Sequence, residues 1–138
     1  MASQVDAVTA ALTSFLEAFA AGDTNAMRDA LADDATAFPR TPSGRSGALA
    51  DSRRTTGIDP EMLDAIDAAR RGGSKPPYLS IDPQDLDVVV SGDMALATFH
   101  LITATELGRR TFVLRCEDNA WKILHTHASN AAGTQTAD

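Results

Sequence analysis

The hydrophobic pattern changes its period once, near Pro77, and this change constrains the fold more than any other feature of the sequence. Before it, apolar residues recur at every third or fourth position, as they do on the buried face of a helix. After it, apolar and polar residues alternate, as in strands with one buried face. Helices that precede an uninterrupted run of strands predict an α+β domain.

The first helix is the best-defined element ahead of this change. Ser3 can cap its start, and Gly22 can end it in the left-handed conformation. Asp23 or Thr24 can then cap a short second helix that runs to about residue 31. The buried face of the first helix comprises Val5, Val8, Leu12, Phe15, Leu16 and Phe19.

The segment from residue 40 to residue 77 is the least regular part of the chain. Its first half is rich in Gly, Pro, Ser and Thr, so we expect a loop, with a helical turn at residues 48–50. Asp59 and Pro60 then provide an N-cap followed by a proline at the first helical position. A third helix is therefore expected to run from this point to Gly72.

Strands account for most of the chain after Pro77. Extended segments are expected there at residues 78–81, 86–90, 94–105, 110–117 and 121–130, and one short extended segment is expected earlier, at residues 35–38. Asp118 and Asn119 tolerate the positive φ angles of a two-residue hairpin turn, and a second hairpin is expected around Leu107 and Gly108. Together these elements predict one domain over residues 1–130 and a flexible tail over residues 131–138.

Alternation assigns the side chains of the last strand to faces of the sheet. The odd-numbered residues from Trp121 to Ser129 fall on one side. Pairing across the hairpin then places Leu114 opposite Ile123, Phe112 opposite His125, and Arg110 opposite His127. This face has an apolar end near Trp121 and a polar end, which is typical of a ligand pocket. The candidate ligand-binding residues are Arg110, His125, His127, Ser129, Thr103 and Phe112.

The opposite face of the sheet carries Ile102, Val113 and Leu124 among charged and polar side chains. This mixture is too polar for a core. We expect the face to form a homodimer interface or to be partly exposed to solvent.

Composition limits the partners and the compartment. The 138 residues fit one domain, and their net charge of −7 repels nucleic-acid phosphate and anionic lipid. We therefore expect neither nucleic acid nor a membrane as a partner. The single cysteine, Cys116, cannot form an internal disulfide, and the N-terminus lacks the pattern of a signal peptide. A cytoplasmic location is expected.

Several segments, in the same order along the chain, resemble the SnoaL-like proteins of the nuclear transport factor 2-like superfamily. The closing strand, WKILHTHAS, is similar to theirs and to the association domain of calcium/calmodulin-dependent kinase II. The sequence SGDMA at residues 91–95 resembles the turn before their central strand, and LADDAT at residues 31–36 is also similar to ketosteroid isomerases. Residues 40–77 depart from the usual pattern. The resemblance implies N-terminal helices packed in the concave face of a curved, mostly antiparallel sheet, an interior cavity, and frequent homodimers.

The resemblance does not imply one reaction, because this fold hosts isomerases, cyclases, dehydratases and non-catalytic binders. Ketosteroid isomerases use a carboxylate base and an oxyanion hole made of a Tyr and a protonated Asp. Where that family has its base, just before a proline, this sequence has Phe38. The family's Tyr lies on the first helix, whereas the only tyrosine here, Tyr78, comes far later along the chain. The isomerase mechanism is therefore not expected here.

Three other residues are candidates for acid–base chemistry. His125 and His127 can form a pair that titrates near neutral pH, and Asp34 can reach the mouth of the pocket. The spacing of the histidines also suits two zinc ligands, but the predicted face offers no third ligand, so no metal or other cofactor is expected. The alternative is that both histidines are half-buried polar residues bonded to their neighbours.

Arg110 is the strongest indication of a ligand. No acidic residue alternates onto its face of the three strands, so a carboxylate or phosphate is its expected partner, with help from Ser129 and Thr103. The alternative is a solvated arginine at the rim of the sheet.

Two functions remain open. One is the binding of a small, partly apolar and acidic molecule; the other is cofactor-independent isomerisation, cyclisation or dehydration by His125 and His127.

Overall fold

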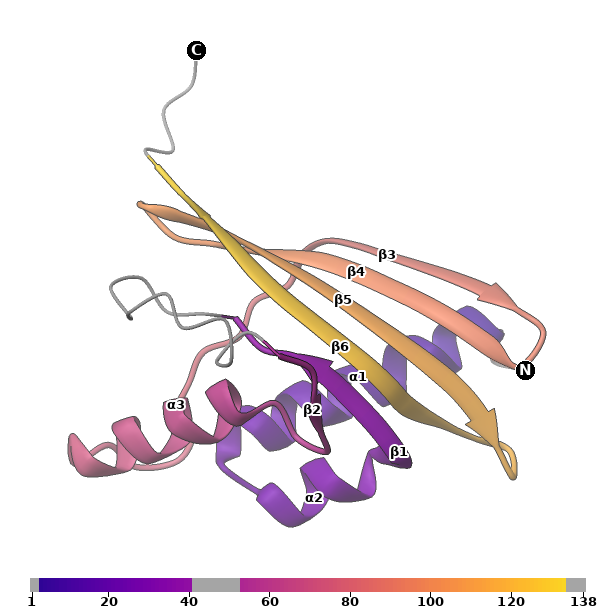
Figure 1. The fold of residues 1–138 in the computed structure, drawn as a ribbon, viewed down its shortest axis with the longest axis horizontal. Helices are drawn as coiled ribbons and strands as arrows, with labels where there is room; N and C mark the ends of the chain where they lie inside the picture. Colours follow the sequence, from indigo (N-terminus) through magenta and orange to yellow (C-terminus); the bar gives the residue numbers. More distant parts are fainter. Residues whose placement is uncertain (1–2, 41–52, 134–138) are drawn as a thin grey trace.

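The computed structural model describes residues 3–40 and 53–133 of the chain. In Figure 1 the long strands cross the upper part of the molecule, α2 and α3 lie below them, and α1 runs behind them. The elements, in chain order, are α1 (Gln4–Ala21), α2 (Thr24–Asp29), β1 (Leu31–Phe38), β2 (Thr55–Thr56), α3 (Pro60–Arg71), β3 (Gln84–Ser91), β4 (Met94–Ile102), β5 (Glu106–Glu117) and β6 (Ala120–Ala132).

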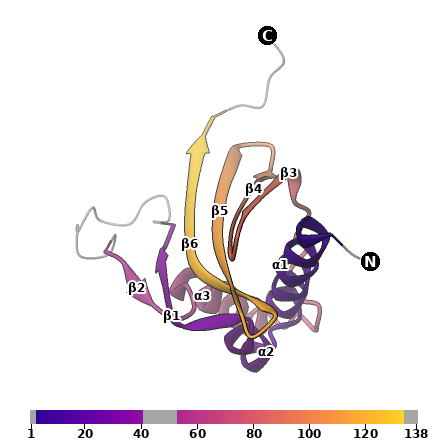
Figure 2. The same ribbon diagram turned by 90° about the vertical axis from the view of Figure 1, so that its right-hand side faces the viewer.

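The strands form one sheet in the order β2-β1-β6-β5-β4-β3. Neighbouring strands are antiparallel, except that β1 and β6 are parallel. The sheet curves, and α1 lies along its concave side (Figure 2). The predicted α+β class, with N-terminal helices on a mostly antiparallel sheet, is confirmed.

The core fills the space between α1 and the concave face of the sheet. Val8, Leu12 and Phe15 of α1 are each at most 1% exposed. The ring of Phe112 in β5 contacts the ring of Phe15 edge-on at 5.8 Å and stacks on the ring of Phe99 at 5.7 Å. Aromatic pairs of this kind add to the free energy of apolar burial. The three rings therefore fix α1 over the middle of the sheet.

The helix ends confirm the predicted caps. The Ser3 hydroxyl accepts a hydrogen bond from the Asp6 backbone N–H at 3.1 Å, and Gly22 ends α1 with a φ of 71°. The Asp23 carboxylate caps α2 by accepting from the Ala26 backbone N–H at 3.0 Å. None of the described helices is long and apolar enough to cross a membrane.

Several predicted boundaries differ from the structure. Residues 78–81 do not form a strand, because the backbone N–H of Tyr78 donates to the Ala20 carbonyl of α1 at 2.7 Å. β1 begins at Leu31, earlier than predicted. β6 extends to Ala132, which pairs with Glu106, so the strand includes the first two residues of the predicted tail. Residues 48–50 and 134–138 lie outside the described residues.

A β-bulge in β6 reverses the predicted faces of the second half of that strand. Ile123 pairs with Leu114, but the next pair is His125 with Val113, which leaves Leu124 as an extra residue. One extra residue inverts the alternation of every side chain that follows it. The prediction that the later odd-numbered residues share the face of Ile123 is therefore wrong. The residues affected are His125, His127 and Ser129.

The hairpin between β4 and β5 turns earlier in the chain than predicted. A hairpin around Leu107 and Gly108 would pair Leu101 with Leu114, but Leu101 pairs with Gly108. The turn lies at Thr103, whose backbone N–H donates to the Glu106 carbonyl at 3.0 Å. Gly108, the observed partner of Leu101, and Leu114, the predicted one, are six positions apart. Because side chains alternate with a period of two, an even shift leaves the side chains of β4 and β5 on the predicted faces of the sheet.

Candidate functional site

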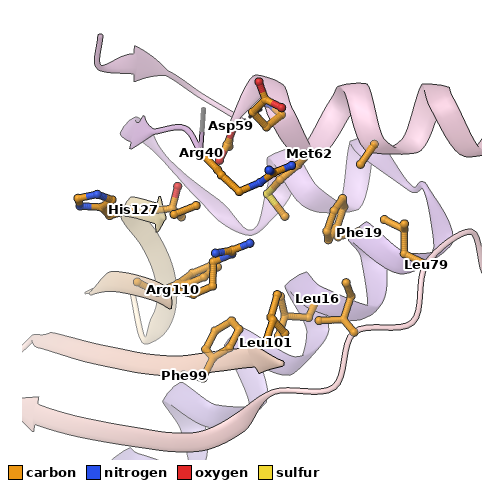
Figure 3. A pocket seen from close by; sticks show the side chains of 16 residues that line it. Leu16, Phe19, Arg40, Asp59, Met62, Leu79, Phe99, Leu101, Arg110 and His127 are labelled. Atoms are coloured by element: carbon orange, nitrogen blue, oxygen red, sulfur yellow. Dashed lines mark hydrogen bonds between the residues drawn. The ribbon is translucent and has the colours of Figure 1, made fainter. Parts of the chain in front are cut away.

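A cavity of about 220 Å³ lies between α1, α3 and the concave face of the sheet (Figure 3). An apolar cavity of about 150 Å³ is large enough to bind benzene in an engineered protein. This cavity therefore has room for a small molecule. Most of its wall is apolar, and this part comprises Leu16, Phe19, Met62, Ala65, Leu79, Ile81, Phe99, Leu101 and Phe112.

Arg110 of β5 brings a positive charge to one end of this cavity. Arg110 pairs with Phe99 of β4, and its side chain extends into the space below α3 (Figure 3). One guanidinium nitrogen, Nη1, donates to the Ser129 carbonyl at 3.0 Å and to Asn130 Oδ1 at 2.9 Å. Gly108 leaves room for this nitrogen, since a Cβ at that position would lie 3.3 Å from it. These contacts hold one side of the guanidinium in place.

A second arginine, Arg40, reaches the same end from another element. It follows Pro39, just after β1 ends, and its side chain lies between α3 and Arg110 in Figure 3. Within residues 3–40 and 53–133, neither arginine forms an ion pair. Burial, together with the charge of Arg40, lowers the pKa of Arg110. Two guanidinium groups in a partly apolar site favour an anion between them.

Asp59 is an acidic group in the same wall. It is the N-cap of α3, where its Oδ1 accepts a hydrogen bond from the Glu61 backbone N–H at 2.8 Å. The residue is 5% exposed, and its second carboxylate oxygen has no hydrogen bond to the described residues. Burial raises the pKa of Asp59, an effect that Arg110 and Arg40 oppose. The free oxygen can accept a hydrogen bond or a proton from a bound molecule.

Among the predicted ligand-binding residues, Arg110 and Phe112 lie in the cavity wall, and His127 borders it. Thr103 lies in the β4–β5 turn instead, where its hydroxyl accepts from the Glu106 backbone N–H at 3.0 Å. Ser129 supports Arg110 through its carbonyl, while its hydroxyl accepts from Arg109 Nε at 3.1 Å. The bulge in β6 explains why the Ser129 hydroxyl is directed away from the cavity.

His125 and His127 form a cluster with Thr36 and Phe38 of β1 on the outer face of the sheet. His125 Nδ1 lies 2.7 Å from the Thr36 hydroxyl oxygen. The Phe38 ring lies 5.3 Å from the His125 ring and 5.5 Å from the His127 ring. Burial and the neighbouring His127 lower the pKa of His125. His127 borders the cavity, but its ring points away from Arg110 (Figure 3).

Asp34 does not reach the cavity. Its exposed carboxylate accepts a hydrogen bond from Arg115 Nη2 at 2.7 Å, and this bond lowers the pKa of Asp34. Among the residues that the structure describes, no group of three or more His, Cys, Asp or Glu side chains could hold a metal ion.

The sequence did not indicate that Asp59 or Arg40 would line the cavity. Asp59 was predicted as a helix cap, and that role alone explains an Asp before a Pro. Arg40 falls in a segment rich in loop-forming residues. The direction of the Arg40 side chain depends on where the chain leaves the sheet. The alternation of side chains along a strand does not predict the direction of residues beyond the end of the strand.

The family model for the SnoaL-like domain matches residues 8–133 of the chain. The chain belongs to the SnoaL-like family. No curated protein matches it.

Solved structures of nuclear transport factor 2-like (NTF2-like) proteins share the fold of this SnoaL-like domain. An NTF2-like protein from Cytophaga hutchinsonii is 16% identical, with a TM-score of 0.66 over 94% of this chain and 100% of that chain. The CaMKII hub of S. rosetta is 22% identical, with a TM-score of 0.65 over 95% of this chain and 99% of that chain. A proposed dehydratase of the NTF2-like family from Streptomyces avermitilis is 23% identical, with a TM-score of 0.63 over 92% of this chain and 95% of that chain. At these identities the likeness shows the fold alone.

Proposed function

We propose that this SnoaL-like protein binds a small, partly apolar acid in the cavity, with the acid group held by Arg110 and Arg40. The observation that supports this function is the pair of arginines in a largely apolar wall, without an ion-pair partner among the described residues. A guanidinium group removed from water is stabilised by an anion that accepts its hydrogen bonds, and a carboxylate fits its planar fork.

The remainder of the cavity favours an apolar body on the same ligand. Phe19, Met62 and Leu101 line the space beyond the arginines. Burial of apolar surface contributes about 25 cal/mol per Å². A ring or short aliphatic chain attached to the acid group would thus add affinity that a simple inorganic anion lacks.

3-Phenylpropionate is a suitable probe, because it joins an aromatic ring to one carboxylate. Arg110→Gln is expected to weaken its binding by roughly 10- to 100-fold, since a hydrogen bond to a charged group contributes about 1.5–3 kcal/mol. Titration followed by ligand-observed NMR gives the Kd of each variant.

Arg109→Gln is the matched control. Arg109 is the exposed neighbour of Arg110 and bonds to the Ser129 hydroxyl outside the cavity, so this variant should bind the probe like the wild type. If the neutral 3-phenylpropan-1-ol bound as tightly as the acid, or Arg110→Gln left the Kd unchanged, acid binding at this site would be wrong.

A cofactor-independent proton transfer is the second candidate function, and the position of Asp59 favours it. The acid–base candidates His125 and His127 lie with Phe38 on the outer face, whereas Asp59 is buried in the cavity wall. A buried carboxylate with a raised pKa can accept a proton from carbon next to a carbonyl group, while the electron pair moves to the carbonyl oxygen. Returning the proton elsewhere on the same molecule completes an isomerisation.

Phenylpyruvate in D₂O tests this second function, since it has an enolisable carbon, a carboxylate and an aromatic ring. If Asp59 is the base, the protein should accelerate deuterium uptake above the buffer rate, and Asp59→Asn should remove the acceleration. His125→Gln and His127→Gln should leave it unchanged. Exchange at the buffer rate with the wild-type protein would exclude this reaction for the probe. Loss of the acceleration in His125→Gln or His127→Gln would instead identify that histidine as the base.

We further propose that the protein forms a homodimer through the outer face of the sheet. This face carries exposed apolar side chains on three strands, among them Phe38, Val89 and Leu96. A patch of exposed apolar side chains on a domain of this size is typical of an interaction surface.

A further inference from the structure

We propose that the ligand is a hydroxy acid, in which the carboxylate binds to Arg110 and Arg40 while a hydroxyl group on one of the next two carbons donates a hydrogen bond to Asp59. The inference rests on the proposed binding of an acid and adds the chemical class of that acid. It follows from three features of the polar end of the cavity: two guanidinium groups, one buried carboxylate, and one oxygen of that carboxylate without a hydrogen bond to residues 3–40 or 53–133.

A ligand with only an acid group offers no hydrogen-bond donor to the free oxygen of Asp59. Asp59 is 5% exposed, and its other oxygen is already bonded to the Glu61 backbone N–H. No fully buried side-chain oxygen of the described residues lacks a hydrogen-bond partner, so the second oxygen of Asp59 is accessible from the cavity. A site that accepts a hydrogen bond from its ligand discriminates against analogues that lack the donor. A ligand that fills the cavity displaces water from this oxygen, so it is favoured when it supplies a donor itself.

Helix capping does not require the second carboxylate oxygen of Asp59. The cap requires one acceptor for the Glu61 N–H, and Ser, Asn and Asp serve about equally well as N-caps. A serine would cap α3 without placing a further acceptor in the cavity. The second oxygen of Asp59 is thus available to a bound molecule.

The number of donors favours a hydroxyl over an ammonium group. An ammonium group has three N–H donors and a full charge, whereas Asp59 offers one free oxygen. Glu61 also lines the cavity, but it already takes part in another interaction. The other charged groups in the wall, Arg40 and Arg110, would repel an ammonium group, and most of the wall is apolar. One hydroxyl donor matches one free acceptor.

Four probes that share the phenylpropanoid skeleton test the inference in the wild-type protein. They are 3-phenylpropionate, 3-phenyllactate, 3-hydroxy-3-phenylpropionate and phenylalanine, with both enantiomers of each chiral compound. At least one hydroxy acid should bind roughly 10- to 100-fold more tightly than 3-phenylpropionate, since its hydroxyl pairs with a carboxylate. Phenylalanine should bind more weakly than that hydroxy acid.

Asp59→Ser then assigns the preference to Asp59. This variant keeps the cap but removes the second oxygen and the negative charge of Asp59. Because that charge repels a carboxylate ligand, 3-phenylpropionate should bind at least as tightly as to the wild type, and the preferred hydroxy acid should lose its advantage over it. Circular dichroism and thermal unfolding show whether α3 is retained, and the wild-type series decides the question by itself if the variant does not fold.

The outcomes separate this inference from the binding function on which it rests. If no acid binds more tightly than 3-phenylpropan-1-ol, the binding function fails. If the acids bind through Arg110 but no hydroxy acid is preferred, or phenylalanine binds most tightly, the binding function stands and the hydroxy-acid inference is overturned. A preference that persists in Asp59→Ser also overturns the assignment of the hydroxyl to this residue.

Discussion

Asp59 has two roles, and they favour opposite protonation states of the same carboxyl group. Capping α3 favours the charged form, because the helix N-terminus carries partial positive charge. Burial in the cavity wall favours the neutral form, and burial is the larger effect, since the pKa of Asp59 is raised above its ordinary value of 3.8. The folded protein therefore binds this proton more tightly than the unfolded chain does.

Asp59→Asn is expected to stabilise the protein at neutral pH relative to the wild type. Because the pKa is raised in the folded state, the stability that protonation provides is complete below pH 3.8 and is lost as the pH rises through the folded-state pKa. Asn stays neutral throughout, so its advantage should shrink as the pH falls toward 3.8. Urea unfolding at a series of pH values measures this difference.

Asp67→Asn is the control for that experiment, because Asp67 lies on the same helix with a largely exposed side chain. Asp67→Asn removes an exposed carboxylate from α3 in place of the buried one, so the pH dependence that belongs to burial is the difference between the two variants. If Asp59→Asn were destabilising at neutral pH and neutral in acid, the charged cap would be the stronger effect and the assignment of the raised pKa to burial would be wrong.

The connection between α1, α3 and β3 depends on Gly22. Its φ of 71° favours glycine, and a Cβ at this position would lie 2.8 Å from Cε2 of Tyr78. Arg70 of α3 donates to the Gly22 carbonyl at 3.2 Å and stacks over the Tyr78 ring at 5.2 Å. One glycine thus permits the segment after α3 to pack against the end of α1.

Gly22→Ala is expected to reduce the free energy of unfolding by more than about 1 kcal/mol, because positive-φ strain adds to a steric clash. Gly73→Ala separates the two effects, since Gly73 has a φ of 83° after α3, but beyond its chain neighbours no described residue has an atom within 4 Å of its Cβ position. Urea denaturation of both variants should show the larger loss for Gly22→Ala. Equal losses would mean that the contact with Tyr78 does not constrain the fold.

At the same scale, β6 shows where sequence reasoning stops. Alternation located this strand and its hairpin with β5, because both depend on local residue types. The bulge at Leu124 was not predictable from Ile123, Leu124 and His125, since each suits a regular strand. Arg110 was placed correctly because β5 pairs regularly with β4, while the side chains after the bulge were assigned to the wrong face.

Across the whole molecule, the sequence predicted the class of fold and one of the three charged residues that define the polar end of the cavity. The period change gave helices before strands, and the absence of an acidic neighbour drew attention to Arg110. Arg40 and Asp59 reach the cavity only through tertiary structure. One follows the end of β1 and the other begins α3, and no local pattern indicates that these two points meet above β5.

The outer face of the sheet carries the last prediction, which concerns assembly. Leu96 of β4 pairs with Val89 of β3 and Val113 of β5, so the three form an apolar row across the strands. Val89 is 54% exposed and Leu96 is 43% exposed. If this row is a dimer interface, sedimentation should give twice the chain mass of 14.5 kDa, and Leu96→Glu should give a monomer by burying an unpaired charge. Val5→Glu is the control, because Val5 is also 43% exposed but lies on α1. A monomeric wild type would contradict the dimer, and a dimeric Leu96→Glu would place its interface elsewhere.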